Sequence, residues 1–138
     1  MTPEQVTCVQ ESFKQVAPIA DAAAALFYEN LFSADPSLKP LFRGNMEEQG
    51  KKLMQMIAVA VSKLDDLPTL VPVLQNLGKR HVAYGVEAGH YETVGAALLK
   101  TLGQGLGEAF TPAVEDAWAS AYGLMAHTML EAAETVTA

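Results

Sequence analysis

Apolar residues recur along this chain at intervals of three and four, the spacing that places them on one face of an α-helix. Between residues 46 and 64 they are Leu53, Ile57, Val61 and Leu64. The same spacing aligns apolar residues in three later segments: Leu70, Leu74 and Leu77; Val94, Leu98 and Leu102; and Val114, Trp118, Ala121, Met125 and Met129. The strict alternation that is typical of β-strands is nearly absent. The pattern therefore predicts an all-α chain.

Capping residues and prolines mark where these helices begin. The segment Thr2-Pro3-Glu4-Gln5 combines an N-cap threonine, a proline at the first helical position and a capping-box glutamine. Pro18, Asp35-Pro36, Pro68 and Thr111-Pro112 give similar signals. We predict helices over approximately residues 3–16, 18–32, 36–42, 46–64, 68–81, 91–106 and 112–134, with a connection at 85–89. No repeat or linker interrupts them, so six or seven helices should form a single domain, residues 1–138.

Three polar side chains interrupt these apolar faces. Gln49 lies four residues before Leu53, and Tyr28 lies four residues before Phe32. His81 continues the apolar line of its own helix. A buried polar group without a partner costs about 1–3 kcal/mol, so three of them predict a shared cavity with something bound in it. A neutral imidazole is a good iron ligand, and tyrosine and glutamine can donate hydrogen bonds to a polar ligand on that iron. A haem is the best candidate.

Each polar residue also has a simpler explanation. A lone histidine on an apolar face is more often a core residue whose hydrogen bonds are satisfied, and a tyrosine there usually bonds a carbonyl. Gln49 could lie at the boundary and reach outward. His90 is expected to be solvent-exposed, and His127 is expected to form a surface pair with Glu131. The six methionines are expected to fill the core.

Composition excludes several classes of function. The net charge of −7 argues against nucleic-acid binding and against docking on anionic lipid. The single cysteine, Cys8, can form neither an internal disulfide nor a zinc site and fits a reducing compartment. The N-terminus shows no secretory signal, and no apolar run is long enough to span a membrane. We therefore expect a cytoplasmic protein without a membrane segment.

Several segments together resemble the globins, and among them the haem domain of bacterial flavohaemoglobins and their single-domain relatives. The resemblance covers nearly the whole chain, in order and at the family's spacing. Tyr91 follows His81 by ten residues, as in the family. The other segments that carry the resemblance are Phe27–Phe32, Asp35–Leu38, Leu41-Phe42, Gln49 with Leu53, Leu77–His81, Tyr84–Val86, His90-Tyr91, Ala117-Trp118 and Ala121–Gly123.

The resemblance implies a fold and a set of roles. The fold would be a three-over-three helical sandwich around one haem b. His81 would be the proximal iron ligand, Tyr28 and Gln49 the distal donors, and Tyr91 would orient His81. Arg80 would pair with a haem propionate. The residues implied to line the haem are Phe42, Leu53, Ile57, Leu77, Val86 and Val94.

The chain departs from the flavohaemoglobin pattern at two points. In that family a glutamate of the last helix completes a His–Tyr–Glu set, but an ungapped alignment places Ala133 there. Glu131 and Glu134 are close, and a one-residue bulge could bring Glu134 into place. The chain also shows no Rossmann pattern, because the glycines between residues 103 and 107 follow a helical stripe rather than a strand. Turnover would therefore need an external reductase.

Two functions remain open at this point. The first is tight binding of dioxygen and nitric oxide that supports nitric-oxide dioxygenation with an external reductase. The second is dioxygen storage, scavenging or sensing without obligatory catalysis. Carbon monoxide is a further expected ligand, and a monomer or weak dimer is the expected state. A plain structural helical domain would not explain three aligned polar residues.

Overall fold

The computed structural model describes residues 1–42 and 44–137. Within them the chain forms six α-helices and no strand, which confirms the all-α prediction. The helices are α1 (Pro3–Val16), α2 (Ala20–Ala34), α3 (Met46–Ser62), α4 (Leu67–Ala83), α5 (Ala88–Leu106) and α6 (Pro112–Thr137). Three short 3₁₀ helices connect them: η1 (Ala17–Ile19), η2 (Pro36–Leu41) and η3 (Gly107–Ala109). In these residues no helix combines the length and the apolar character that crossing a bilayer requires.

Several predicted helix ends differ from the observed ones. Helix α2 starts and ends two residues later than predicted, α3 ends two residues earlier and α4 two residues later. The largest differences, three residues each, are at the start of α5 and the end of α6. Helix α5 begins at Ala88 rather than Tyr91, because Glu87 and His90 form a reciprocal capping box at its start. The helix then continues to Leu106 and stops at Gly107, whose φ of +56° ends the regular geometry. Helix α6 runs to Thr137, beyond the predicted end at 134. The capping box predicted at Thr2 is confirmed.

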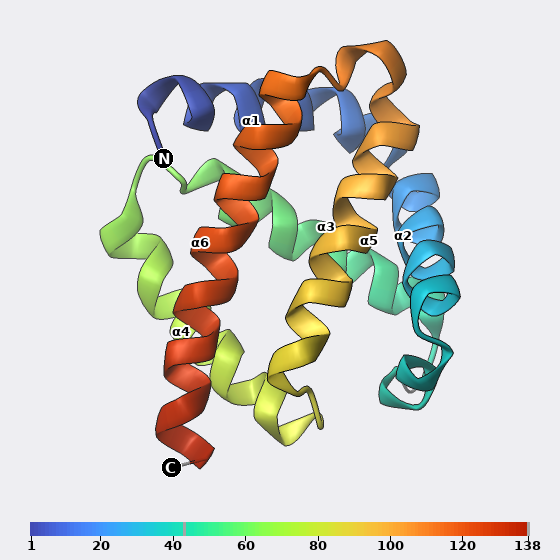
Figure 1. Ribbon diagram of the computed structural model, residues 1–138, viewed down its shortest axis with the longest axis vertical. Helices are drawn as coiled ribbons and strands as arrows, with labels where there is room; N and C mark the ends of the chain where they lie inside the picture. Colours follow the sequence, from blue (N-terminus) through green and yellow to red (C-terminus); the bar gives the residue numbers. More distant parts are fainter. Residues whose placement is uncertain (43, 138) are drawn as a thin grey trace.

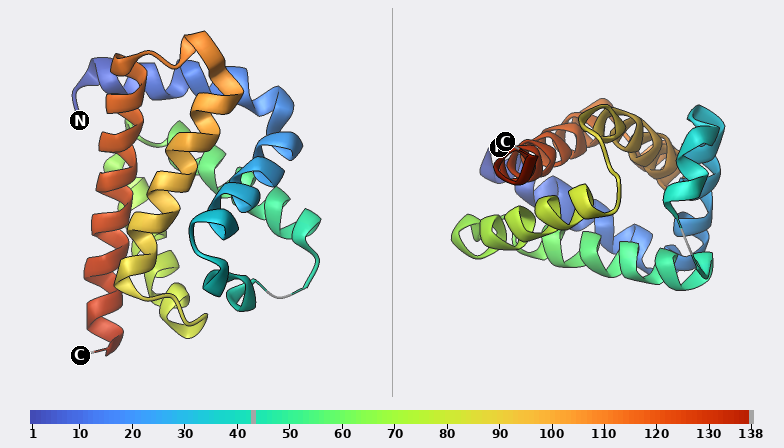
Figure 2. Two further views of the ribbon diagram at one scale, coloured as in Figure 1. Left: turned by 45° about the vertical axis from the view of Figure 1, so that its right-hand side comes forward. Right: turned by 90° about the horizontal axis from the view of Figure 1, so that it is seen from below.

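The helices form the predicted three-over-three sandwich (Figures 1 and 2). Helices α1, α3 and α4 make one layer, and α2, α5 and α6 make the other. Seen from below, α3 and α4 lie opposite α5 and α6, and α2 closes one side (Figure 2, right). Contacts between the layers are most extensive between α4 and α6, followed equally by α1 with α6 and α2 with α3. The layers thus enclose space that side chains from five helices can line.

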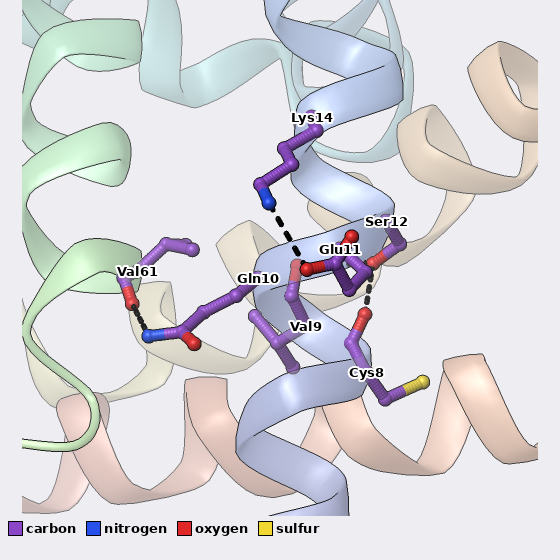
Figure 3. Close-up of polar contacts among 7 residues, drawn as sticks. All are labelled: Cys8, Val9, Gln10, Glu11, Ser12, Lys14 and Val61. Carbon is purple, nitrogen blue, oxygen red and sulfur yellow. Dashed lines mark hydrogen bonds and ion pairs between the residues drawn. The ribbon is translucent and has the colours of Figure 1, made fainter.

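Buried hydrogen bonds anchor α1 across the top of the molecule (Figures 1 and 3). The Ser12 hydroxyl donates to the Cys8 carbonyl at 2.7 Å and accepts from Trp118 Nε1 at 2.8 Å. Trp118 is completely buried, so an unpaired indole N–H would be costly. Gln10 Nε2 donates to the Val61 carbonyl at 3.1 Å. These bonds tie α1 to both α6 and α3.

Glycines set how closely the other helices approach. A Cβ on Gly78 would lie 2.3 Å from the Met129 carbonyl oxygen, so α4 lies directly against the α6 backbone. A Cβ on Gly95 would lie 2.6 Å from the Tyr122 ring, which occupies the space that this glycine leaves. These close approaches fix α4 and α5 relative to α6. His81, one turn after Gly78, and Tyr91, one turn before Gly95, therefore have defined positions.

Candidate functional site

A cavity of about 330 Å³ lies between the two layers. Its volume falls in the range of small-molecule and cofactor sites. The wall is predominantly apolar and draws residues from α2, η2, α3, α4, α5 and α6. An apolar wall with few polar groups is typical of a site that excludes water and orients its occupant through those groups.

The cavity brings together nearly all of the residues singled out in the sequence. They are Tyr28, Phe42, Gln49, Leu53, Ile57, Leu77, His81, Val86, Tyr91 and Val94. Arg80 is the one expected site residue that does not line the cavity, and its side chain is exposed. The three polar residues that interrupt apolar helix faces thus meet in one place, as the sequence predicted.

His81 is held by its own helix. Its Nδ1 lies 2.7 Å from the Leu77 carbonyl oxygen, four residues earlier. Since a carbonyl can only accept, Nδ1 carries the proton and Nε2 keeps its lone pair. Burial lowers the pKa of His81 below the usual value, the Leu77 bond opposes this, and the nearby positive charge of Arg80 adds to it. The ring is therefore neutral at pH 7 and suited to ligate a metal through Nε2.

Tyr28 lies within a cluster of aromatic rings in the cavity wall. Its ring centroid is 5.3 Å from that of Phe42, in an edge-to-face arrangement, and 6.0 Å from that of Phe32. The side chain is only 8 % exposed. A Cβ on Gly50 would lie 3.0 Å from the Ala24 Cβ, so glycine at this position lets α3 come close to α2. Burial raises the pKa of the phenol, so its hydroxyl stays protonated and can donate.

The start of α3 places Gln49 at the cavity. Asn45 caps this helix, and its Oδ1 accepts from the N–H groups of Glu47 and Glu48 at 2.9 and 3.1 Å. Gln49 follows on the first turn, where it is half-buried and lines the cavity. Its Nε2 lies near Gly44, whose added Cβ would be 3.9 Å away. Gln49 and Tyr28 thus both line the cavity, from α3 and α2 respectively.

The hydroxyl of Tyr91 is a buried polar atom without a partner. The side chain is 8 % exposed, and no hydrogen bond to its hydroxyl is present in the part of the chain that the structure describes. Its ring centroid is 6.5 Å from that of His81. The Tyr91 carbonyl accepts from the Tyr122 hydroxyl at 2.6 Å, which fixes the backbone here. A buried hydroxyl of this kind indicates an acceptor that enters with a ligand or with water.

The last helix brings no carboxylate to that hydroxyl. Glu131 pairs instead with His127 at 2.8 Å on the exposed face of α6, which confirms the predicted surface pair. Glu134 is also exposed, and Ala133 occupies the position at which the resemblance implied a glutamate. A completed His–Tyr–Glu set is therefore absent from the residues that the structure describes.

Sequence reasoning missed part of the cavity wall. His90 is half-buried and lines the cavity, so the expectation of a solvent-exposed histidine was wrong. Its Nδ1 accepts from the Glu87 N–H at 3.0 Å, and this capping role keeps the ring at the helix start. A histidine three residues after Glu87 was a signal that could have shown this. Further residues of the wall that were missed include Leu31, Leu38, Met56, Leu74, Trp118, Tyr122, Met125, Ala126 and Met129.

Comparison with known proteins identifies the fold. The family model for globins matches residues 25–129. The chain belongs to the globin family. A bacterial globin structure from Campylobacter jejuni aligns with this globin with a TM-score of 0.85 and 27 % identity, over 99 % of each chain.

Within the family, the chain is similar in sequence to flavohemoproteins. This globin is 33 % identical over 134 residues to a flavohemoprotein of Bordetella parapertussis, covering 94 % of this chain and 33 % of that protein. It is 37 % identical over 113 residues to a flavohemoprotein of Chromobacterium violaceum, covering 79 % of this chain and 28 % of that protein. The chain thus spans about a third of the length of these curated relatives. It is similar to their haem domain.

The globin family generally binds haem, and the residues of this cavity fit such a group. One half-buried imidazole presents an unprotonated Nε2, as iron ligation requires. The wall also carries the phenol of Tyr28 and the amide of Gln49, and the rest of it is mainly apolar. The unpartnered hydroxyl of Tyr91 leaves one further polar group for a bound ligand or a water.

Proposed function

We propose that this globin binds haem b, with His81 as the proximal iron ligand, and holds dioxygen and nitric oxide tightly. The observation that carries the proposal is the 2.7 Å contact between His81 Nδ1 and the Leu77 carbonyl. This contact leaves Nε2 as the only nitrogen of the ring that can ligate, within a cavity of cofactor size. An imidazole whose Nδ1 is bonded to its own helix keeps Nε2 available for a ligand.

The remaining site residues have separable roles in this proposal. Tyr28 and Gln49 donate hydrogen bonds to a polar diatomic ligand, an electrostatic stabilisation that is strong because the wall excludes water. Phe42, Leu53 and Ile57 contribute to that apolar wall. The wall also includes Leu77, Val86 and Val94. Arg80 is exposed and does not line the cavity; in this proposal it would pair with a propionate of the haem.

Nitric-oxide dioxygenation is the reaction that we propose this site supports. When bound, haem supplies a ferrous centre at which dioxygen and nitric oxide combine to nitrate, and a separate reductase returns one electron for each turnover. The similarity to the haem domain of flavohemoproteins supports this reaction. Tyr28 and Gln49 contribute by holding dioxygen, and the apolar wall admits nitric oxide.

A second candidate is dioxygen storage, scavenging or sensing without obligatory catalysis. The observation in its favour is on the proximal side, where His81 donates to a main-chain carbonyl and not to a carboxylate. A neutral acceptor withdraws less of the Nδ1 proton, so the imidazole donates less electron density to a metal. The Tyr91 hydroxyl has no partner among the described residues, so no carboxylate reaches the proximal side through it either. This is consistent with a weakly electron-donating imidazole.

Optical spectra separate these possibilities. Haem-loaded protein is recorded in the ferric state, then in the ferrous state under dioxygen, and then after a pulse of nitric oxide. Immediate conversion to the ferric spectrum with release of nitrate supports dioxygenation, and sustained turnover with a reductase makes the protein an enzyme. A stable dioxygen spectrum that reacts only slowly with nitric oxide favours storage or sensing. Absence of a Soret band would refute haem binding.

A further inference from the structure

The cavity wall contains a second histidine, His90, to which the proposed function gives no role. Helix α5 begins at Ala88, after the short loop that follows α4 (Figure 1), and His90 lies in its first turn. The side chain is half-buried and lines the same cavity as His81. The two histidines therefore face one occupant from the ends of two consecutive helices.

The hydrogen bond to Nδ1 decides where the proton of His90 lies. Nδ1 accepts from the main-chain N–H of Glu87 at 3.0 Å. A ring nitrogen that accepts a hydrogen bond carries no proton, so in the neutral ring the proton is on Nε2. His81 is the reverse case, because its Nδ1 lies 2.7 Å from the Leu77 carbonyl oxygen and its Nε2 is unprotonated. The cavity is thus lined by one imidazole that offers a lone pair and by another that offers an N–H donor.

The protein's own groups leave this donor for an acceptor in the cavity. The Glu87 side chain accepts from the main-chain N–H of His90, so this carboxylate already has a partner within the capping box. The adjacent Tyr91 also lines the cavity, and its buried hydroxyl has no hydrogen bond among the described residues. Two neighbouring residues of α5 therefore supply donors whose acceptor enters with the occupant.

The surroundings of His90 suit an ionised acceptor. Tyr84 lines the cavity but is exposed, so the wall reaches the surface at this loop. A carboxylate at such a place keeps part of its hydration, which avoids the large cost of burying an ionised group. The first turn of the 19-residue helix α5 also carries the positive end of the helix dipole. No lysine or arginine is among the described residues that line the cavity, so His90 has no cationic competitor there.

We propose that His90 binds a carboxylate of the cavity's occupant through Nε2–H. The inference rests on the proposed function, in which the occupant is haem b and the carboxylate is one of its two propionates. The second propionate is left for Arg80. His81 and His90 then recognise chemically different parts of the same cofactor, the metal and the carboxylate edge. His90 is in this role a binding residue that sets how the cofactor is turned within the cavity.

Substitutions at position 90 can keep the helix cap and change the donor alone. His90→Glu keeps an acceptor for the Glu87 N–H and replaces the ring N–H by an anion. His90→Gln keeps both an acceptor and an N–H donor. Ala88→Glu is the matched control, because Ala88 is exposed in the same turn and does not line the cavity. It adds the same negative charge, and urea titration shows whether each variant folds like the wild type.

The rate at which each protein loses its cofactor to an excess of an apoglobin acceptor, followed in the Soret band, measures retention. Each protein is loaded with haem b or with haem b dimethyl ester, which has no carboxylate. With haem b, His90→Glu should speed the loss by about tenfold or more, because repulsion replaces a charge-assisted hydrogen bond. His90→Gln should stay within about threefold of the wild type, and Ala88→Glu within about twofold, since an exposed charge contributes little. With the dimethyl ester, all four proteins should lose the cofactor at equal rates.

Three outcomes would contradict these expectations. If His90→Glu speeds the loss of haem b and of the dimethyl ester equally, position 90 only supports the helix, and the proposal is overturned. An unchanged loss of haem b in a folded His90→Glu protein would also overturn it. A wild type without a Soret band after addition of haem b would refute haem binding and this assignment together. Failure of the proposed function is therefore recognised before the variants are compared.

NMR of the wild type tests the same bond if His90→Glu does not fold. In protein with ¹⁵N-labelled histidine and carbon monoxide bound, the two nitrogens of each ring are distinguished by their shifts. We expect His90 Nδ1 to be unprotonated, with an Nε2–H proton that exchanges slowly with haem b and rapidly with the dimethyl ester. A proton on Nδ1, or equal exchange with both cofactors, would refute the proposal.

Discussion

Replacing Tyr28 by phenylalanine isolates one hydroxyl group in the proposed site. The aromatic ring remains, so its edge-to-face packing on Phe42 at 5.3 Å and on Phe27 at 5.4 Å is retained. The ring is buried among these neighbours, which leaves little room for it to move. The variant should therefore fold like the wild type and differ in a single hydrogen-bond donor.

The expected effect follows from the strength of that donor. A hydrogen bond to a group that carries charge contributes about 1.5–3 kcal/mol. Each 1.36 kcal/mol corresponds to a factor of ten in rate, so Tyr28→Phe should speed dioxygen dissociation by about 10- to 160-fold. Carbon monoxide carries less charge when bound, so its dissociation should change much less.

Stopped-flow replacement of dioxygen by excess carbon monoxide measures this rate. Tyr84→Phe is the matched control, because Tyr84 also lines the cavity but is 59 % exposed and lies beside His81, with ring centroids 5.8 Å apart. It should leave the rate unchanged. An unchanged rate in Tyr28→Phe would show that another group, with Gln49 the first candidate, is the main donor.

Four further predictions test the proximal side and the fold. His81→Ala should abolish stable haem retention, and a normal five-coordinate histidine spectrum in that variant would refute the ligand assignment. Gly78→Ala forces a Cβ to within 2.3 Å of a carbonyl oxygen of α6 and should lower the free energy of unfolding by about 1–3 kcal/mol in urea titration. Gly123→Ala meets nothing within 4 Å and should raise it by about 0.5–1 kcal/mol. Tyr122→Phe loses the 2.6 Å bond to the Tyr91 carbonyl and should cost about 1 kcal/mol, measured in the same titration.

The sequence was sufficient to predict that the helices exist and to find three polar residues of the cavity, because both depend on periodicity. Tyr28, Gln49 and His81 each replace an apolar residue at a position where helical spacing requires burial. In a fold made of helices alone, such positions must face the interior. Their convergence on one cavity follows once the layers are assembled.

Features that depend on three-dimensional packing could not be predicted from the spacing of residues along the chain. The start of α5 was misplaced because a histidine side chain, His90, caps it, a role that usually belongs to glutamine or glutamate. The unpartnered hydroxyl of Tyr91 depends on the direction of one side chain. The intervals between residues in the sequence do not predict these properties.

The bond between His81 and the Leu77 carbonyl has a consequence for how this protein tolerates mutation. The acceptor belongs to the main chain, so every residue that keeps the helix intact at position 77 also keeps the acceptor. An orienting side chain on another helix could be lost through a single codon change. Here, selection can act on the last helix, including position 133, without changing which nitrogen of His81 is protonated. The protonation of the two His81 nitrogens therefore does not depend on side chains elsewhere in the sequence.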